Sequence, residues 1–361
     1  MEKIDIVRRF FEKNVLLTEE SLDMLCSLDD QTIERILGVS HDNNILDKKN
    51  ILDLVDPVNR SVNFDVIRNI KHINNIVTTD DQVGFVNKKY NFLKGILEQR
   101  LRRDFVSLNK INSLREEVYT IGIVKDIRRG DKLAVDIEDP TSVSTVLLDI
   151  SENKIDLDDV IAVAAVSGGK TLIGKKIYYP DVPIRQPIYG KGIGCFIPSI
   201  NLKTSPKNHV EELMRWLSTQ VFDYLFVFGD DDDLRYLENQ GIQKTVFFSP
   251  AVDEVHASYT TNVTNIISLS NPSIVNFNGM NVLMCHRFDV GMLKRRYMGS
   301  NSIMNEAFFM DMIPDIVFHH GRDPFITNYK SVTCVTPGSI STSLTPILVN
   351  FSSRESTQIK L

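Results

Sequence analysis

The sequence lacks both a long apolar run and closely spaced cysteines. No window of its 361 residues comes near the roughly 18 to 20 apolar residues that cross a bilayer, so no membrane contact is expected. The four cysteines have no Cys-x-x-Cys spacing, which argues against a disulfide framework or a structural zinc site. They are Cys26, Cys195, Cys285 and Cys334. This pattern is typical of proteins in a reducing cytoplasm.

The chain also lacks an excess of basic residues. Its 41 Lys and Arg are outnumbered by 47 Asp and Glu, which gives a formal net charge of -6 at pH 7. A protein that binds duplex DNA by itself usually carries a basic excess, because it must neutralise phosphates. Short basic clusters do occur, at Arg100/Arg102/Arg103, Arg128/Arg129 and Lys294/Arg295/Arg296. Such clusters are more often solvated faces than nucleic-acid contacts.

The N-terminus is unlike a secretory signal, because charged residues interrupt its apolar ones. Instead, residues 1–39 predict a small helical module. The apolar residues that recur at helical spacing along a first helix are Ile4, Val7, Phe10 and Phe11. Thr18 is a candidate cap for a second helix, and Asp29 or Asp30 for a third that stops at Gly38. We interpret this part as a tethering or docking module.

Two further segments follow this module. Residues 40–79 are rich in Asn and Asp without a sustained apolar period, which predicts a linker of limited order. Residues 80–112 predict a connecting helix of about 20 residues, capped by Asp80 or Asp81. The apolar residues at i, i+4, i+7 and i+11 are Val86, Tyr90, Leu93 and Leu97. Such a stripe usually packs against a core rather than binding a ligand.

Residues 113–185 change to short strands with period-two alternation. The predicted strands are Val118 to Val124, Leu133 to Ile137, Ser144 to Asp149, Val160 to Val166 and Leu172 to Ile177. Five strands in about sixty residues predict a closed barrel of the oligonucleotide-binding (OB) type, although composition does not exclude another small barrel. The stretch Ser167-Gly168-Gly169-Lys170-Thr171 lacks the upstream glycine of a phosphate-binding loop and is flanked by strands. We interpret it as a β-turn.

From residue 186 to residue 361, buried strands alternate with helices, as in a layered domain. The predicted strands are 192–197, 224–228, 245–248, a hairpin over 274–285, 315–318, 332–335 and 347–351, with a helix around Val210 to Leu217. A four-layer αββα sandwich accommodates them, so the whole chain is predicted to be multidomain α+β. The acidic run Asp230 to Asp233 is interpreted as a solvated loop, because consecutive carboxylates point in different directions.

Several stretches occur in the order found in one protein family. They are the helical module, the spacing of Phe85, Tyr90, Leu93, Leu97 and Arg100, the strand from Val118 to Val124, Asp158-Asp159-Val160, Pro180-Asp181-Val182-Pro183, Leu269-Ser270-Asn271-Pro272 and Pro314-Asp315-Ile316-Val317. In this order they resemble the small subunit of archaeal family D DNA polymerases, a relative of the B subunits of eukaryotic replicative polymerases. The resemblance covers nearly the full length. It implies that residues 186–361 form a calcineurin-like phosphoesterase domain.

The resemblance also implies five motifs that, in active members, hold two divalent ions about 3.5 to 4 Å apart for phosphodiester cleavage. Asp230 and His286 remain in register as ligands, in the second and fourth motifs. The first motif, Asp-x-His, falls on Ser199-Ile200-Asn201, the third, Gly-Asn-His-Asp, on Pro250-Ala251-Val252-Asp253, and the fifth, Gly-His-x-His, on His320-Gly321-Arg322-Asp323. The degenerate positions are Ser199, Asn201, Ala251, Val252, Gly321 and Asp323.

We therefore expect a degenerate site with no catalytic residue, no resident cofactor and no nuclease activity. The rival hypothesis is a rearranged ligand set that binds manganese or magnesium and retains 3′ to 5′ exonuclease activity. Its candidate ligands are Asn201, Asp253, His319, His320 and Asp323, with His256 if the third motif has shifted. A His-His pair at a strand end is, however, more often a hydrogen-bonded structural pair than a pair of ligands.

The resemblance implies the function of an accessory subunit. Such a chain docks on the large catalytic subunit of a heterodimeric cytoplasmic polymerase, which synthesises DNA on a template and brings this chain to DNA. A third hypothesis is a free-standing single-stranded-DNA-binding protein, in which bases stack on exposed aromatics of the barrel within a positive groove. The aromatic residues near the predicted barrel are Tyr119, Tyr178 and Tyr179. The residues that contact nucleic acid are not identified by the sequence.

Overall fold

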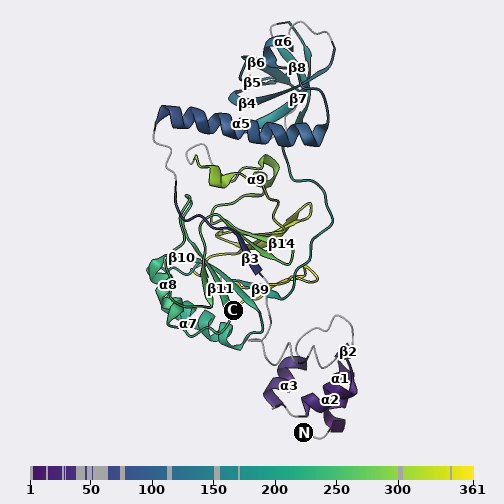
Figure 1. The fold of residues 1–361 in the computed structure, drawn as a ribbon, viewed down its shortest axis with the longest axis vertical. Coiled ribbons are helices and arrows are strands. Elements are labelled where there is room, and N and C mark those ends of the chain that lie inside the picture. The colour runs from purple at the N-terminus through teal and green to yellow at the C-terminus, as the bar shows by residue number, and fades with distance from the viewer. Residues whose placement is uncertain are drawn as a thin grey trace. The chain divides into compact units, whose positions relative to one another are not determined.

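The computed structural model consists of two compact units, Met1–Asn63 and Phe64–Leu361. It describes residues 3–13, 15–26, 28, 30–37, 45–46, 51, 64–73, 78–111, 116–149, 155–169, 171–299, 304–341 and 344–361. The first unit is the predicted helical module. The second contains the barrel and the layered domain, with a long helix packed against both (Figure 1). Within the described residues, no helix is both long and apolar enough to cross a membrane.

The N-terminal unit is built from the predicted helices and a two-stranded parallel sheet. Its elements are α1 (Lys3–Glu12), α2 (Glu19–Leu25), α3 (Asp30–Leu37), β1 (Leu16–Leu17) and β2 (Ile45–Leu46). Thr18 caps α2 as predicted, since its side chain accepts a hydrogen bond from a backbone N–H at 3.3 Å. On α1, Ile6 and Phe10 are buried, whereas Ile4 and Phe11 are 76% and 66% exposed. The apolar residues of this helix therefore occupy two faces, one buried and one open.

Two parts of the predicted linker are strands, so the linker prediction was wrong for residues 45–46, which form β2, and for residues 64–68. β3 (Phe64–Arg68) pairs antiparallel with β13 (Ser273–Phe277) at the edge of a sheet. The Phe64 ring centroid lies 5.0 Å from that of Phe247. The sequence does not indicate this strand, because only its two end residues are partly buried and the strand therefore lacks an alternating apolar pattern. The predicted helix stop at Gly38 and most of the remaining linker lie outside the described residues.

The predicted connecting helix begins earlier and ends earlier than expected. α5 (Thr79–Leu101) is capped by Thr78, whose hydroxyl accepts a hydrogen bond from the N–H of Asp81 while the Asp81 carboxylate accepts one from the N–H of Thr78. This capping box satisfies two N–H groups of the first turn. The helix ends at Leu101 and is followed by Arg102, whose φ of 49° is left-handed, and then by a separate short helix, α6 (Leu108–Ile111). The residues of α5 that pack against the barrel include Tyr90, Leu93 and Leu97.

The five predicted barrel strands are confirmed. They are β4 (Val118–Arg129), β5 (Leu133–Asp139), β6 (Ser142–Leu148), β7 (Val160–Ser167) and β8 (Leu172–Tyr178). They close in the order β4-β5-β6-β8-β7, and the pairs are antiparallel except β6 with β8. This Greek-key order is that of an OB-type barrel. Gly174 permits the close approach of β8 to β6, because a Cβ there would overlap the side chain of Leu148.

Within the described residues, the layered domain contains two six-stranded sheets packed face to face (Figure 1). The first has the order β12-β11-β10-β9-β18-β19, and the second has the order β16-β17-β15-β14-β13-β3. The predicted strands are β9 (Ile193–Phe196), β10 (Tyr224–Gly229), β11 (Thr245–Pro250), β13, β14 (Met280–Met284), β15 (Ile316–Phe318), β17 (Val332–Pro337) and β18 (Ile347–Asn350). Besides β3, three strands were not predicted, namely β12 (Ile266–Ser268), β16 (Pro324–Tyr329) and β19 (Ser356–Gln358).

Aromatic rings fill the space between the two sheets. The Phe226 ring of β10 stacks on Phe196 at 4.6 Å and lies 6.0 Å from Phe277 of the opposite sheet. Helices α7 (Lys207–Thr219) and α8 (Asp231–Glu238) cover the outer face of the first sheet. The helix α9 (Val290–Arg295), the short helix η2 (Glu306–Phe308) and part of α5 cover the second sheet (Figure 1). The order helix, sheet, sheet, helix confirms the predicted layers.

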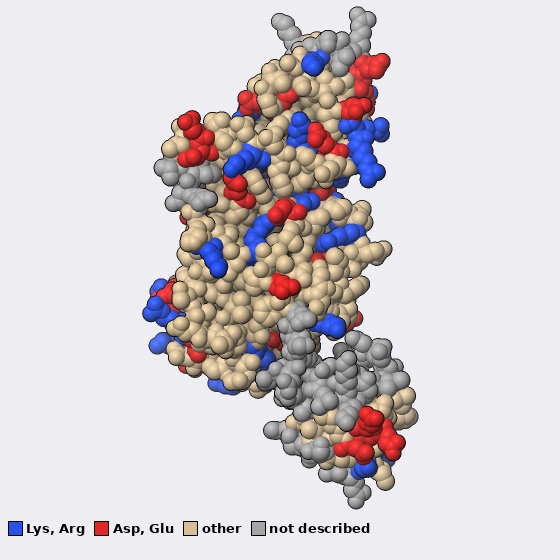
Figure 2. Space-filling model, viewed as in Figure 1, with Lys and Arg blue, Asp and Glu red and all other residues tan. Residues whose placement is uncertain are grey.

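Several members of the basic clusters form contacts within the fold. Arg128 donates to both carboxylate oxygens of Asp136, at 2.7 and 2.9 Å. Arg296 is 6% exposed and donates to the carbonyl oxygen of Met310, while Lys294 lies 4.0 Å from the ring centroid of Tyr179. On the face shown in Figure 2, basic and acidic side chains are interspersed. Arg102, Arg103 and Arg129 are exposed, so these clusters combine structural contacts with solvated positions.

Candidate functional site

Loops from both sheets meet at the carboxyl ends of the parallel strands. Strands β9, β10 and β11 are parallel in the first sheet, and β14 and β15 in the second, so the residues that follow them gather at one edge. The Ser199 hydroxyl lies 3.1 Å from Nδ1 of His320. The ring of His320 stacks on that of His286 at 4.8 Å, and Nδ1 of His286 lies 3.0 Å from Oδ1 of Asp253. The structure therefore brings together motif positions from both sheets.

Other predicted positions make local contacts instead. The side chain of Asn201 accepts a hydrogen bond from a backbone N–H three residues later, at 3.2 Å. The N–H of Ala251 donates to the end of β10 at 2.9 Å, and the carbonyl of Val252 accepts a hydrogen bond from an asparagine side chain at 2.7 Å. Gly321 is half-buried, and Asp323 is exposed. Asn201 and Asp323 therefore have no contact with the two stacked histidines among the interactions of the described residues.

The two remaining histidines of the rival ligand set are separate from this group. His319 is 4% exposed, and its Nδ1 lies 3.0 Å from the carbonyl oxygen of His320 and 3.3 Å from the hydroxyl of Thr336. Its Nε2 is buried with no hydrogen-bond partner among the described residues. Nδ1 of His256 lies 2.6 Å from a neighbouring backbone carbonyl. Of the rival set, only Asp253 and His320 join His286.

Asp230 is the N-cap of α8, so the prediction of a solvated loop for residues 230–233 was wrong. Its Oδ1 accepts the N–H of Asp233 at 3.0 Å, and Oδ2 of Asp233 accepts the N–H of Asp230 at 2.8 Å. Its Oδ2 accepts a hydrogen bond from Nζ of Lys203 at 2.8 Å, and the same ammonium group lies 3.0 Å from Asp232. The remaining predicted ligand of the first sheet is thus neutralised by a lysine and committed to starting a helix.

The charge states of these groups follow from burial and hydrogen bonding. Burial disfavours the charged form of Asp230, but the hydrogen bonds from Lys203 and from backbone N–H groups outweigh it, so the pKa of Asp230 is lowered. Burial lowers the pKa of His286 although Asp253 opposes this, and burial together with His286 lowers the pKa of His320. The stacked imidazoles are therefore neutral near pH 7. Like charges in parallel rings are avoided in this way.

The donor set does not match a two-metal centre. Such a centre needs carboxylate, imidazole and amide donors directed at two shared ions. In the part of the chain that the structure describes, which includes every motif position, no group of three or more His, Cys, Asp or Glu is placed to hold a metal ion. The two remaining predicted ligands, Asp230 and His286, are instead engaged with Lys203 and Asp253.

Asp230→Ala is expected to lower the free energy of unfolding by about 1 kcal/mol, because it removes the N-cap of α8. Urea-induced unfolding followed by circular dichroism measures this change. Asp232→Ala is the matched control, since it removes a carboxylate of the same loop that also contacts Lys203 but leaves the cap in place. Equal stability of Asp230→Ala and the parent chain would contradict the capping role.

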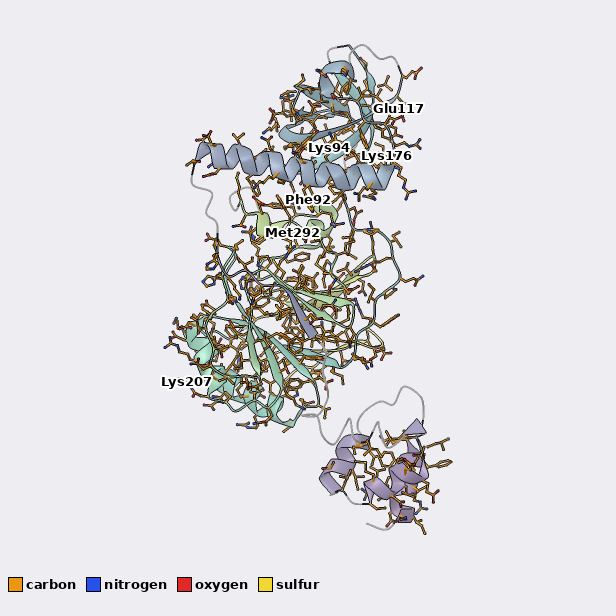
Figure 3. The ribbon with its side chains drawn as sticks, in the orientation of Figure 1. Phe92, Lys94, Glu117, Lys176, Lys207 and Met292 are labelled. Atoms are coloured by element: carbon orange, nitrogen blue, oxygen red, sulfur yellow. The ribbon has the colours of Figure 1, made fainter. Side chains whose placement is uncertain are left out.

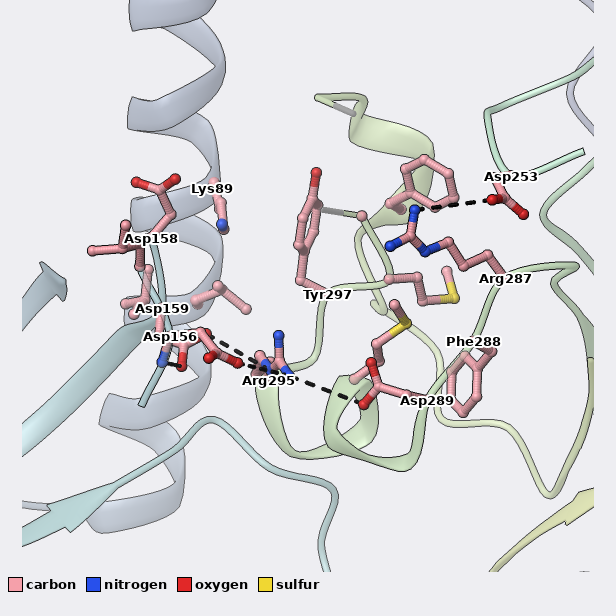
Figure 4. A pocket seen from close by; sticks show the side chains of 17 residues that line it. Lys89, Asp156, Asp158, Asp159, Asp253, Arg287, Phe288, Asp289, Arg295 and Tyr297 are labelled. Carbon is pink, nitrogen blue, oxygen red and sulfur yellow. Dashed lines mark hydrogen bonds and ion pairs between the residues drawn. The ribbon is translucent and has the colours of Figure 1, made fainter. Parts of the chain in front are cut away.

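A cavity of about 770 Å³ lies beside this edge, where α5, the connection between β6 and β7 and the loop after β14 meet (Figure 4). Arg295 lines the cavity and reaches two carboxylates from the barrel, with Nη2 3.1 Å from Asp156 and Nε 3.8 Å from Asp159. Lys89 of α5 points into it, with Nζ 4.5 Å from the ring centroid of Tyr297. The cavity is therefore lined by charges of both signs, contributed by the barrel, the helix and the layered domain.

Two of the cavity's ionisable groups are held in an unfavourable environment. Asp159 is 6% exposed, and burial raises its pKa to about 6 against the pull of a backbone hydrogen bond and of Arg295. Burial also lowers the pKa of Lys89. Asp253 lines the cavity and accepts from His286, and its other oxygen lies 3.9 Å from Arg287. The cavity and the histidine pair therefore share one carboxylate.

Sequence reasoning missed Lys203, Lys89 and Arg295. Lys203 lies two residues after the first motif in a polar loop, and nothing in its spacing predicts a partner in α8. Arg295 belongs to a basic cluster, which by itself indicates a solvated face. Asp158-Asp159-Val160 was noted as a family stretch, and the burial of Asp159 against Arg295 is the signal that only the fold reveals.

Comparisons with known proteins add a distant relationship. No family model matches the chain. The DNA polymerase II small subunit of Methanothermobacter thermautotrophicus is 22% identical over 338 residues, which cover 76% of this chain and 67% of that protein. This level of identity shows distant homology between the two proteins over about three quarters of this chain.

Solved structures show only partial similarity. A single mutant of Vps29 from Entamoeba histolytica is 9% identical, with a TM-score of 0.30, over 47% of this chain and 99% of that one. A protein assigned as an aspartyl-tRNA synthetase from Leishmania major is 14% identical, with a TM-score of 0.18, over 21% of this chain. This chain spans only 20% of the length of the synthetase.

Proposed function

We propose, on the premise that this chain is a distant homologue of a DNA polymerase II small subunit, that it is the accessory subunit of a heterodimeric replicative DNA polymerase. The large catalytic subunit of that enzyme would carry out nucleotide transfer, and this chain would reach DNA through the complex. The observation that carries the proposal is the 22% identity over 76% of the chain. The succession of helical module, OB-type barrel and layered domain supports it.

The proposal includes the loss of the 3′ to 5′ exonuclease. Its support is chemical: Ser199 replaces an expected aspartate and hydrogen-bonds with His320. Lys203 donates a hydrogen bond to Asp230, the carboxylate that would have to bind a metal ion. The third motif contributes Ala251 and Val252, whose side chains have no atom that can bind a metal ion. Binding to the large subunit, rather than phosphodiester cleavage, is then the work of this domain.

Co-expression with the family D large subunit tests both parts of the proposal. We expect a stoichiometric complex on gel filtration that extends a primed template. We also expect neither the complex nor this chain alone to degrade 3′-labelled single-stranded DNA in manganese, and metal analysis to find no stoichiometric ion. Failure of the two chains to co-purify would contradict the accessory role, whereas co-purification with manganese-dependent degradation would contradict only the loss of the nuclease.

One observation favours a second candidate function, a metal-dependent exonuclease with a rearranged ligand set. Asp253, His286 and His320 do lie close together at the edge of the sheets, and both imidazoles are neutral. As placed they do not form a metal-binding group, so this alternative requires the three side chains to rearrange around an ion. Under this alternative, degradation in manganese or magnesium would be abolished by Asp253→Ala and by His286→Ala. Asp311→Ala, at an exposed carboxylate that belongs to no motif, would leave it unchanged.

A further inference from the structure

Part of the outer surface of the barrel extends past the end of α5. Strand β7 lies between β4 and β8, and its residue Ala164 pairs with Tyr119 on one side and Lys176 on the other. The next row inward is Ile121, Ala162 and Tyr178, of which Ile121 and Ala162 are buried under α5 while Tyr178 at the end of the row is half-buried. Because the helix ends at Leu101, the row with Tyr119 and Lys176 lies beyond it. Figure 3 shows Lys176 and Glu117 near this end of α5.

Aromatic rings and basic groups alternate on this surface. The rings of Phe105 and Tyr119 lie 6.4 Å apart, and those of Tyr119 and Tyr178 lie 6.2 Å apart. The Arg103 guanidinium lies 5.7 Å from the Tyr119 ring centroid, and Nζ of Lys176 lies 5.1 Å from that of Tyr178. The three rings are half-buried and the two basic side chains are exposed. We call these five residues the tyrosine patch.

The side of the barrel that OB folds usually present to oligonucleotides is unsuited to that task here. That side is formed by the second and third strands, β5 and β6. The sequence from Leu133 to Leu148 contains no aromatic residue on which a base can stack. The nearby cations are paired with carboxylates: Lys125 lies 2.9 Å from Glu138, and Arg128 lies 2.7 Å from Asp136. Nucleic-acid chemistry on this barrel is therefore concentrated at the tyrosine patch.

We propose that the tyrosine patch is a binding site for single-stranded DNA, in which bases stack on Tyr119 and Tyr178 while Arg103 and Lys176 contact the phosphates. Stacking on aromatic rings beside mobile cations is the general means by which proteins hold single strands without sequence preference. Tyr179, the third aromatic that the sequence suggested, takes no part because it is 5% exposed. The site goes beyond the proposed function and does not depend on a large subunit.

The charges around the patch predict weak binding that depends on salt. Exposed Arg102 and Lys175 add to its two cations, but Glu117 lies 2.8 Å from Lys175. The chain as a whole carries a net charge of -6, which repels phosphates at long range. Binding should therefore be measurable at low ionic strength and should weaken with added salt, with a slope of roughly -0.7 for each phosphate contact.

Fluorescence anisotropy of a labelled dT oligonucleotide with the full chain, at low salt, tests the proposal. We expect Tyr119→Ala and Tyr178→Ala each to raise Kd by about 5-fold or more, because one base–aromatic stack is lost. Lys176→Ala should raise Kd and reduce the salt slope by about 0.7. Lys125→Ala, at an exposed lysine of the same barrel outside the patch, is the matched control and should leave Kd unchanged.

Circular dichroism of each variant separates lost binding from lost folding, and Lys176→Ala, at an exposed position, keeps the test valid if a tyrosine variant unfolds. No binding of the parent chain at low salt would overturn the proposal. A Kd raised equally by Lys125→Ala and Lys176→Ala would also overturn it, since binding would then be a diffuse charge effect. Neither result bears on co-purification with a large subunit, so the two proposals fail separately.

Discussion

Asp315→Ala is expected to lower the free energy of unfolding by about 3 to 5 kcal/mol, because it removes a fully buried carboxylate, which leaves the half-buried Arg185 without its ion-pair partner and the buried Asn281 N–H without its acceptor. Asp315 is 0% exposed, and its Oδ1 lies 2.7 Å from Nη2 of Arg185. Its Oδ2 also accepts the N–H of Asn281 at 2.8 Å. The ion pair attaches the segment that leaves the barrel to the strand that leads to the histidines. Urea-induced unfolding at pH 7 measures the loss.

Asp311→Ala provides the matched control for this prediction. Asp311 is paired with Arg68, but its side chain is 58% exposed, and exposed ion pairs contribute about 0 to 1 kcal/mol. A loss for Asp315→Ala no larger than that for Asp311→Ala would show that the buried pair does not hold this segment in place.

Asp159→Asn is expected to remove a pH dependence of stability worth up to about 3 kcal/mol. Burial raises the pKa of Asp159 from 3.8 to about 6, and one pKa unit corresponds to about 1.4 kcal/mol. Because the folded-state pKa is the higher one, this group carries no penalty below about pH 4, and the penalty grows as pH rises through about 6. Relative to the parent chain, the variant should therefore gain stability between pH 4.5 and pH 8.

Unfolding of both proteins in urea at these two pH values measures the gain. Glu117→Gln, which removes one negative charge from the exposed surface of the same barrel, is the matched control. An Asp159→Asn variant whose difference from the parent is the same at both pH values would show that Asp159 is not held in a desolvated position beside Arg295. The prediction thus tests the closure of the cavity between barrel and layered domain.

Local sequence patterns predicted the barrel and most of the two sheets, because those strands carry their own signal. The five barrel strands alternate with a period of two and are separated by turn residues. Strands such as β10 are continuously buried and apolar. The strand β3 was missed because its central residues are exposed, and its place depends on β13, about two hundred residues later in the chain.

The candidate site was predictable as a set of positions but not as a set of contacts. The resemblance placed Ser199, Asp253, His286 and His320 at strand ends, and the parallel order of the strands brings them together. Asp230 caps its helix through Asp233, whereas its charge is neutralised by Lys203, which lies in a separate polar loop. No rule of spacing predicts which cation will neutralise a carboxylate, because the pairing is made across separate segments.

From the amino-acid sequence alone came the strand periods and, through the resemblance, the expected order of domains and the expected replacement of metal-binding side chains by Ser, Ala, Val and Gly, since each depends on residue identity over a few neighbours. The tertiary structure alone decided that two histidines stack, that Asp159 is buried and that Tyr119, Tyr178 and Lys176 share one surface. The physical reason is that burial and contact arise between segments distant in the chain, which only the packed sheets and barrel bring together.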